Sequence, residues 1–538
     1  MNAGRIFSYF VAMKSYVLLF LILIFPFFIK AQSKIDVLHY RFNIELNDNN
    51  DTIYGKAEIT VKFKEAASEI EFDLVQAKEG KGMHVSKVEE TGIRGFVRNK
   101  ERFQIFFSRV LKDSVRTFII NYHGIPADGL IISKNKYGHR TFFADNWPDR
   151  AHNWIPCVDD PSDKASVEFI VTTPSHYQVV SNGVQIEETN LPANKKLTHW
   201  KEDVPLPTKV MVIGVADFAV NTAGYIDCIP VYSWVFPENK TDGFYDYALA
   251  KEILAYYNNY IGPYPFKKLA NVQSKTIFGG MENAGAIFYH ENSVDGKRTE
   301  EGLFAHEIVH QWFGDMATEK NFAHIWLSEG FATYLTHIYY ESKYGVNVFN
   351  ERMTEDRKAI IDFAKNSVRP VVDSVSPYMQ LLNANSYQRG GWVLHMLRRQ
   401  LGDSVFHKSI REYYETYKGK NANTEELQAI FEKVSGKKLD TFFQQWLYRP
   451  EIPQLKVTWK YDATGKNVSV TVTQLQKGGL FQFPLDISIQ EFSSVPKIMG
   501  RTIKDTVQTF VFPVKTKPIV KIDPLTSLLF EGTITESK

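Results

Sequence analysis

The spacing of apolar residues changes twice along this chain of 538 residues, and this change limits which folds the chain can adopt. From residue 35 to about residue 220, apolar and polar residues alternate with a period of two, which is typical of strands with one buried face. From about residue 244 to about residue 448 a helical spacing replaces the alternation, with a break expected near Pro370. The alternation then returns. The clearest alternating runs are residues 38–46, 57–63, 165–171, 455–461 and 468–472.

The order of these regions predicts a multidomain α+β protein. We expect an N-terminal β-sandwich or β-sheet domain over residues 32–222, a mostly helical domain over residues 223–450, and a small C-terminal β-sandwich domain over residues 451–538. The length fits this division, because a single hydrophobic core stops growing beyond about 250–300 residues.

The first residues resemble a targeting segment. Lys14 precedes an uninterrupted apolar run over residues 16–29, and the small residue Ala31 follows. We therefore predict a cleaved signal peptide over residues 1–31, with Met13 as a better start than Met1, and export to the periplasm, the cell surface or the medium. An uncleaved membrane anchor is the alternative. It is disfavoured because the run is shorter than the roughly 20 residues of a spanning helix and contains Pro26, so we expect no stable membrane insertion after cleavage.

Charge and cysteine content exclude several classes of function. There are 63 basic and 61 acidic residues, a net charge of +2 without any basic run, which argues against binding to nucleic acid or to an anionic membrane. The only cysteines are Cys157 and Cys228. We expect two buried free thiols, although a disulfide stays open for an exported protein. Neither cysteine has the spacing of a zinc ligand.

The strongest chemical signal is His306-Glu307-Ile308-Val309-His310. On a helix, residues i and i+4 lie on one face, so both imidazoles can bind one zinc ion while Glu307 flanks it without binding. Helix formation is favoured because Thr299 can cap the N-terminus, acidic residues follow it, and Gly314 suits the end of the helix. Alone, the pattern also fits a surface helix that carries two histidines.

Two further segments supply groups that such a site needs. A hydrolytic zinc site requires three protein ligands and an open position. Glu329 lies near the start of a second predicted helix, with eighteen residues between it and His310. Upstream, residues 279–283 place Glu282 beside glycines, which allow a strand edge to approach a ligand closely. Read alone, residues 279–283 would be a flexible loop.

Together these segments resemble the M1 family of zinc aminopeptidases in order and spacing. The resemblance covers residues 35–450 and includes Gly280-Met281-Glu282-Asn283, His306-Glu307-x-x-His310, residues 326–332 and residues 154–161. It implies a thermolysin-like catalytic domain with one Zn²⁺ per chain. The implied roles are zinc binding by His306, His310 and Glu329, general base for Glu307, donation to the oxyanion by Tyr387, and binding of the substrate's α-ammonium group by Glu282, with Gly279, Gly280, Met281 and Asn283 contacting substrate around it.

The chain also departs from the family pattern. Glycine replaces the usual alanine at position 280, and the interval from Glu329 to Tyr387 is 58 residues, which is short for the family. A second amine-binding residue usually comes from the β domain, and we expect Asn146, or else Asp145, in that role.

The resemblance is to a short form without the C-terminal helical domain of larger members. We expect a cleft open on that side unless a second copy of the chain covers it. Because no roof would then offer basic groups to a peptide's carboxylate, we expect little preference for tripeptides over decapeptides.

The expected function is hydrolysis of the first peptide bond of peptides with a free N-terminus. Three alternatives remain: a zinc endopeptidase with the same metal site, a related zinc hydrolase that acts on a lipid epoxide, and a non-enzymatic exported protein with a vestigial site. A carboxylate at position 282 favours the aminopeptidase over the endopeptidase, because only the former needs an amine-binding group.

Overall fold

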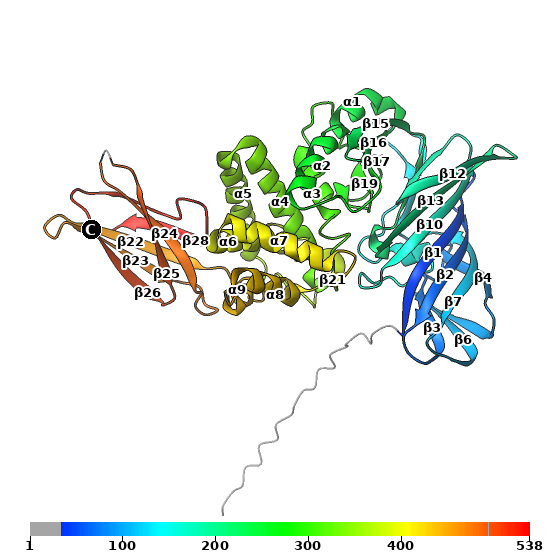
Figure 1. The fold of residues 1–538 in the computed structure, drawn as a ribbon, viewed down its shortest axis with the longest axis horizontal. Coiled ribbons are helices and arrows are strands. Elements are labelled where there is room, and N and C mark those ends of the chain that lie inside the picture. Colours follow the sequence, from blue (N-terminus) through cyan, green and yellow to red (C-terminus); the bar gives the residue numbers. More distant parts are fainter. Residues whose placement is uncertain (1–33, 493, 538) are drawn as a thin grey trace, which may run out of the picture.

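The structure is a computed structural model that describes residues 34–492 and 494–537. The predicted signal peptide lies outside the described residues and stays a prediction. In the described part of the chain, no helix combines the length and the apolar character needed to cross a membrane. The described chain is elongated, with N-terminal sheets at one end, helices in the middle and a β-sandwich at the other end (Figure 1).

Strands of the N-terminal region form a large mixed sheet in the order β12-β13-β10-β1-β2-β7-β4, with smaller sheets β3-β6-β5 and β11-β14-β9-β8. The alternation predicted at residues 57–63 is confirmed, since every second residue of β2 is buried. The strand bounds are β1 Ile35–Glu45, β2 Ile53–Phe63, β3 Ala67–Asp73, β4 Gly82–Glu89, β5 Ile93–Asn99, β6 Arg102–Leu111, β7 Val115–Ile125, β8 Leu130–Lys134, β9 Arg140–Ala144, β10 Ala165–Pro174, β11 Gln178–Ser181, β12 Val184–Leu191, β13 Lys195–Leu206 and β14 Ile213–Ala216.

The middle region begins with a sheet in the order β15-β16-β17-β19-β18, so that β18 is an edge strand. The domain boundary predicted at residue 222 falls inside β15. The bounds are β15 Ala219–Ile226, β16 Ile229–Val235, β17 Leu269–Ser274, β18 Gly280–Met281 and β19 Ala286–His290.

Helices follow this sheet and carry the motif residues. They are α1 Lys240–Tyr247, α2 Leu249–Tyr260, α3 Glu301–His310, α4 Trp326–Tyr344, α5 Val346–Ala364, α6 Gly390–Leu401, α7 Asp403–Tyr417, α8 Thr424–Ser435 and α9 Asp440–Leu447, with a short pairing of β20 Thr318–Glu319 and β21 Asn421–Ala422. The break expected near Pro370 is confirmed, because α5 ends at Ala364.

Two local details differ from the sequence prediction. Residues 244–254 belong to two helices, α1 and α2, which meet at Ala248. Thr299 does not cap α3: Glu300 occupies the N-cap, and the Thr299 hydroxyl donates to Asp295 instead (2.6 Å). The Thr299 hydroxyl therefore has its partner inside the loop before α3.

The C-terminal region is a small sandwich of two sheets, β26-β23-β22-β28 and β25-β24-β27. Alternate residues of β23 and β24 are buried between them. The predicted multidomain α+β fold is thus confirmed. The bounds are β22 Gln454–Asp462, β23 Asn467–Gln474, β24 Phe483–Gln490, β25 Lys497–Ile503, β26 Val507–Pro513, β27 Ile519–Ile522 and β28 Glu531–Glu536.

The cysteines are both free, but they differ in exposure. Cys157 is buried as expected, whereas Cys228 is exposed, so the expectation of two buried thiols is wrong for Cys228. Cys228 lies in the tight turn between β15 and β16, where a side chain has no core to enter.

Candidate active site

Helices α3 and α4 bring His306, His310 and Glu329 together. His306 Nε2 lies 3.1 Å from His310 Nε2, and Glu329 Oε2 lies 3.2 Å from each of these two nitrogens. Atoms that bind one zinc ion tetrahedrally at ~2.0–2.2 Å are about 3.3 Å apart. The three groups therefore fit a zinc ion, and their donor set of two imidazoles and one carboxylate is typical of hydrolytic zinc sites.

The ring of His310 is held by hydrogen bonds at its other nitrogen. Nδ1 lies 3.2 Å from the carbonyl oxygen of Phe313 and 3.0 Å from the hydroxyl of Ser328. A proton on Nδ1 satisfies the carbonyl and leaves the Nε2 lone pair free for a metal ion. Ser328 directly precedes Glu329, so one turn of α4 supplies one group that could bind a metal ion and a hydrogen bond to the ring of another, His310.

Tyr387 reaches the metal-binding groups because two glycines allow α4 and α6 to approach each other. A β-carbon on Gly330 would lie 2.9 Å from the backbone of Gly390, which only glycine tolerates. Tyr387 lies in a single π-helical turn, Asn385–Arg389, directly before α6, and its ring stacks on His306 with centroids 5.8 Å apart. Burial, and then the charge of Glu329, raise the pKa of the Tyr387 hydroxyl well above its usual value, so the hydroxyl stays a donor.

Glu307 is buried on the β18 side of α3. Burial raises the pKa of its carboxyl well above the usual value, and the neighbouring His310 opposes this shift. A β-carbon on Gly280 would come within 2.4 Å of Oε1 of Glu307. The glycine that departs from the family pattern therefore lets Glu307 lie directly against the edge strand, and an alanine there would require the Glu307 side chain to move.

Glu282 follows β18 and lines a cavity together with His306, His310 and Glu329. Its Oε1 atom is buried and has no hydrogen-bond partner among the described residues. Its backbone carbonyl accepts a 2.6 Å hydrogen bond from Gln311 Nε2, while Gln311 Oε1 accepts one from Gly285 N (2.7 Å). Gln311 thereby fixes the loop that carries Glu282 to the helix that carries the histidines.

A cavity of about 450 Å³ joins these groups. Of the predicted substrate-contacting residues, Gly279, Gly280, Met281 and Glu282 line it. Asn283 does not line it and is fully buried, although its side-chain amide has no hydrogen-bond partner among the described residues.

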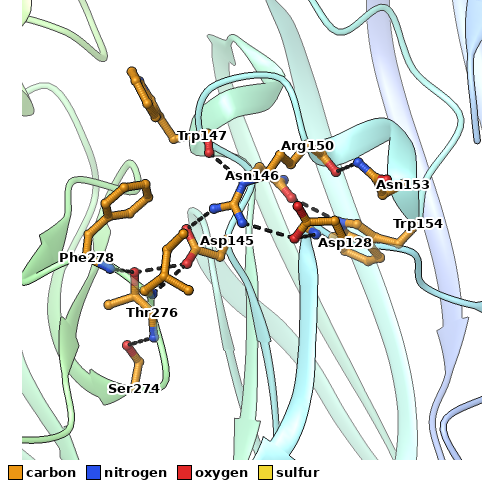
Figure 2. A network of polar contacts seen from close by, with 12 residues as sticks. Asp128, Asp145, Asn146, Trp147, Arg150, Asn153, Trp154, Ser274, Thr276 and Phe278 are labelled. Atoms are coloured by element: carbon orange, nitrogen blue, oxygen red, sulfur yellow. Dashed lines mark hydrogen bonds and ion pairs between the residues drawn. The ribbon is translucent and has the colours of Figure 1, made fainter. Parts of the chain in front are cut away.

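The expectation for Asn146 is not met, because its amide is used inside the protein. Asn146 Nδ2 donates to the carbonyl oxygens of Thr208 (3.2 Å) and Met211 (2.6 Å), and its Oδ1 accepts from Trp154 Nε1 (2.9 Å). Figure 2 shows Asn146 directed toward Trp154, away from Phe278. A buried side chain whose hydrogen-bonding groups are already paired has nothing left to offer a substrate.

The Asp145 carboxylate is also paired with groups of the protein itself. Its Oδ2 accepts from Ile277 N (2.9 Å) and from the Thr276 hydroxyl (3.1 Å), and its Oδ1 lies 2.9 Å from Arg150 Nη2 (Figure 2). The two hydrogen bonds from Thr276 and Ile277 connect the N-terminal region to the loop that leads into Gly279 and β18, and Arg150 balances the charge of the carboxylate that accepts them.

The neighbouring Trp147 does reach the cavity, although the sequence pattern pointed to Asn146 or Asp145. Its ring packs edge-on against Phe278 with centroids 5.9 Å apart, and both side chains line the cavity near Glu282. A tryptophan directly after the predicted amine-binding residue Asn146 carries no local signal of such a role.

Comparison with known proteins places the chain in a family. Residues 245–446 match the model of the peptidase family M1 domain, and residues 37–210 match the model of the peptidase M1 N-terminal domain. Probable aminopeptidase 2 of Sulfurisphaera tokodaii is 30% identical over 363 residues, which cover 63% of this chain and 46% of that protein. Tricorn protease-interacting factor F2 of Thermoplasma acidophilum is 26% identical over 448 residues, covering 79% and 54%.

A solved structure shares the fold. The crystal structure of Legionella pneumophila aminopeptidase A in complex with aspartic acid superposes with a TM-score of 0.81 at 16% identity, covering 94% of this chain and 60% of that one. The chain spans about half the length of the curated relatives that it matches. Because the two family models follow each other along most of the described chain, this protein belongs to peptidase family M1.

Proposed function

We propose that the protein is a zinc metalloaminopeptidase that removes the first residue of peptides with a free N-terminus. The observation that carries this proposal is the buried, unpartnered Oε1 of Glu282 on the wall of the cavity that contains His306, His310 and Glu329. A buried carboxylate oxygen without a partner is costly, and a substrate's ammonium group would pair with it.

The metal would be held by His306, His310 and Glu329. A zinc ion bound there supplies Lewis acidity, which polarises the scissile carbonyl and makes water acidic enough to lose a proton near neutral pH. Glu307 is the base that accepts this proton and then passes it to the leaving amine. The Tyr387 hydroxyl donates a hydrogen bond to the carbonyl oxygen as that oxygen becomes negatively charged.

The substrate's backbone would be aligned by the edge strand. Because β18 ends its sheet, its outer backbone groups can pair with an extended peptide, as exposed strand edges do. Glu282 directly after β18 stops the chain at its ammonium group. Only the first peptide bond then reaches the metal-binding groups, which distinguishes an aminopeptidase from an endopeptidase.

The test compares peptides that differ only at the N-terminus. We expect the protein to release the first residue of a free peptide and to leave the N-acetylated peptide intact. The isosteric change Glu282→Gln should lower kcat/KM for the free peptide by about 10²-fold, since the charged partner of the ammonium group is lost. Cleavage of both peptides would instead identify an endopeptidase, and one zinc ion per chain without any hydrolysis would indicate a vestigial site.

A further inference from the structure

The cavity continues past the metal-binding groups, between α3 and α4, toward α5. Its far part is lined by Leu303 from the first turn of α3, by His337 from α4, and by Arg352 and Asp356 from α5. Glu282 lies at the other end of α3, because Gln311, next to His310, binds its carbonyl oxygen. The cavity therefore has the Glu282 carboxylate at one end and the Arg352 guanidinium group at the other, beside the pair His337–Asp356, with the metal-binding groups between them.

The length of α3 sets the separation of these ends. A β-carbon on Gly302 would lie 3.5 Å from Nη2 of Arg352, so the guanidinium group sits beside the first turn of the helix. From Gly302 to His310 the helix rises by about 12 Å, at 1.5 Å per residue. An extended peptide covers roughly 3.3–3.6 Å per residue, so about three or four residues span this distance.

Arg352 carries a charge that no acidic side chain neutralises. Its guanidinium group lies 3.6 Å from the centroid of the Tyr340 ring, and among the described residues no carboxylate forms an ion pair with it. Asp356, one turn further along α5, pairs with His337 Nε2 at 2.8 Å. Glu301, at the start of α3, is held by Lys343 (2.6 Å). Asp356 and Glu301 thus have other partners.

The chemistry of Arg352 suits one class of ligand. A guanidinium group offers parallel N–H donors in a plane, which match the two oxygens of a carboxylate. Stacking on Tyr340 fixes that plane, and partial burial in the cavity wall reduces competition from water. In a peptide whose ammonium group is at Glu282, the group that arrives at this distance is the C-terminal carboxylate.

We propose that Arg352 binds the α-carboxylate of short peptides, so that tripeptides and tetrapeptides with a free C-terminus are the preferred substrates. The proposal rests on the function proposed above. From the sequence we expected little preference for tripeptides over decapeptides, because no roof domain would offer basic groups to the carboxylate. Arg352 offers such a group from within the helical region, so the proposal replaces that expectation.

The experiment compares a tripeptide, its C-terminal amide and a decapeptide that begins with the same three residues. We expect kcat/KM to be about tenfold or more higher for the free tripeptide than for its amide, and higher than for the decapeptide. In Arg352→Gln the ratio of acid to amide should fall toward one, while Arg352→Lys should retain part of it. The control Lys358→Gln removes a charge from the exposed face of α5 and should keep the full ratio.

Each outcome is decisive, because the ratio of kcat/KM for the free tripeptide to kcat/KM for its amide does not depend on how much of a variant is folded. Equal hydrolysis of acid and amide by the wild-type protein would overturn the role of Arg352 and leave the aminopeptidase assignment standing. An unchanged ratio in Arg352→Gln would also overturn it. If the wild-type protein hydrolyses none of the three peptides, the proposed function itself is wrong, and the role of Arg352 falls with it.

Discussion

At the scale of single residues, Glu307 and Glu329 are adjacent to the same histidines but should behave differently when changed. Glu329 Oε2 lies 3.2 Å from both ring nitrogens, whereas Glu307 lies against Gly280. We expect Glu307→Gln to retain one zinc ion per chain and to lose about 10²–10⁴-fold in kcat, because it removes a proton acceptor and not a ligand. Glu329→Ala should lose zinc, because two protein ligands remain where hydrolytic sites use three.

Elemental analysis of the purified variants separates these roles. Loss of zinc from Glu307→Gln, or full occupancy in Glu329→Ala, would show that the two glutamates are wrongly assigned.

The proposed role of Tyr387, donation of a hydrogen bond to the oxyanion, depends on where its hydroxyl group lies and on that group staying protonated. Its hydroxyl is kept protonated by burial, and its ring is stacked on His306. We expect Tyr387→Phe to lower kcat by about 10²–10³-fold, the usual effect of removing one donor to an oxyanion. Tyr378→Phe is the matched control, because Tyr378 is 44% exposed and packs on Phe322. Steady-state kinetics that show equal rates for Tyr387→Phe and the control would move this role to another group.

At the scale of elements, the connection between β9 and the loop before β18 depends on the pair Asp145–Arg150. The Asp145 side chain is fully buried and that of Arg150 is 12% exposed. Arg150→Met should lower the free energy of unfolding by about 3–5 kcal/mol, because it leaves a buried carboxylate without its charged partner. Lys195→Met, which breaks an exposed pair with Glu45, should cost at most about 1 kcal/mol. Urea unfolding of the two variants checks the difference, and equal losses would contradict it.

Helices and strands could be predicted from the sequence where the spacing of residues within one short segment determines them. The alternation at residues 57–63 specifies β2, and the spacing of His306 and His310 places both rings on one face of α3, because each pattern depends only on chain geometry. Three outcomes could not be predicted in this way. Asn146 is occupied by carbonyl groups more than sixty residues away, and Trp147 and Arg352 reach the cavity only through the packing of separate elements. No spacing along the chain encodes such contacts.

At the scale of the whole molecule, the helical region and the C-terminal sandwich meet through a buried histidine on α6. His395 Nε2 lies 2.7 Å from the carbonyl oxygen of Thr526, and its Nδ1 lies 2.9 Å from the hydroxyl of Tyr334. A neutral ring satisfies both neighbours, by donating to the carbonyl and accepting from the hydroxyl. Nearby, Arg357 pairs with Asp523 of the sandwich. The contact between the two regions thus includes polar interactions beside aromatic packing such as that of Trp446 on Phe481.

This arrangement makes the contact sensitive to acid. Burial lowers the pKa of His395 from 6.5 to about 3. Below pH 6.5 the unfolded chain binds a proton at this residue and the folded chain does not, so the stabilisation present above pH 6.5 is lost as the pH falls toward 3. Between pH 7 and pH 5 the loss should be on the order of 2 kcal/mol, at about 1.4 kcal/mol per pH unit.

The variant His395→Gln tests this prediction, because an amide can donate to Thr526 and accept from Tyr334 without titrating. We expect the free energy of unfolding of the wild-type protein to fall more steeply between pH 7 and pH 5 than that of His395→Gln. Other groups, including Asp523, titrate in both proteins, so the difference between the two curves isolates His395. Parallel curves from denaturant unfolding would show that the ring accepts a proton in the folded protein, and that acid does not weaken this contact through His395.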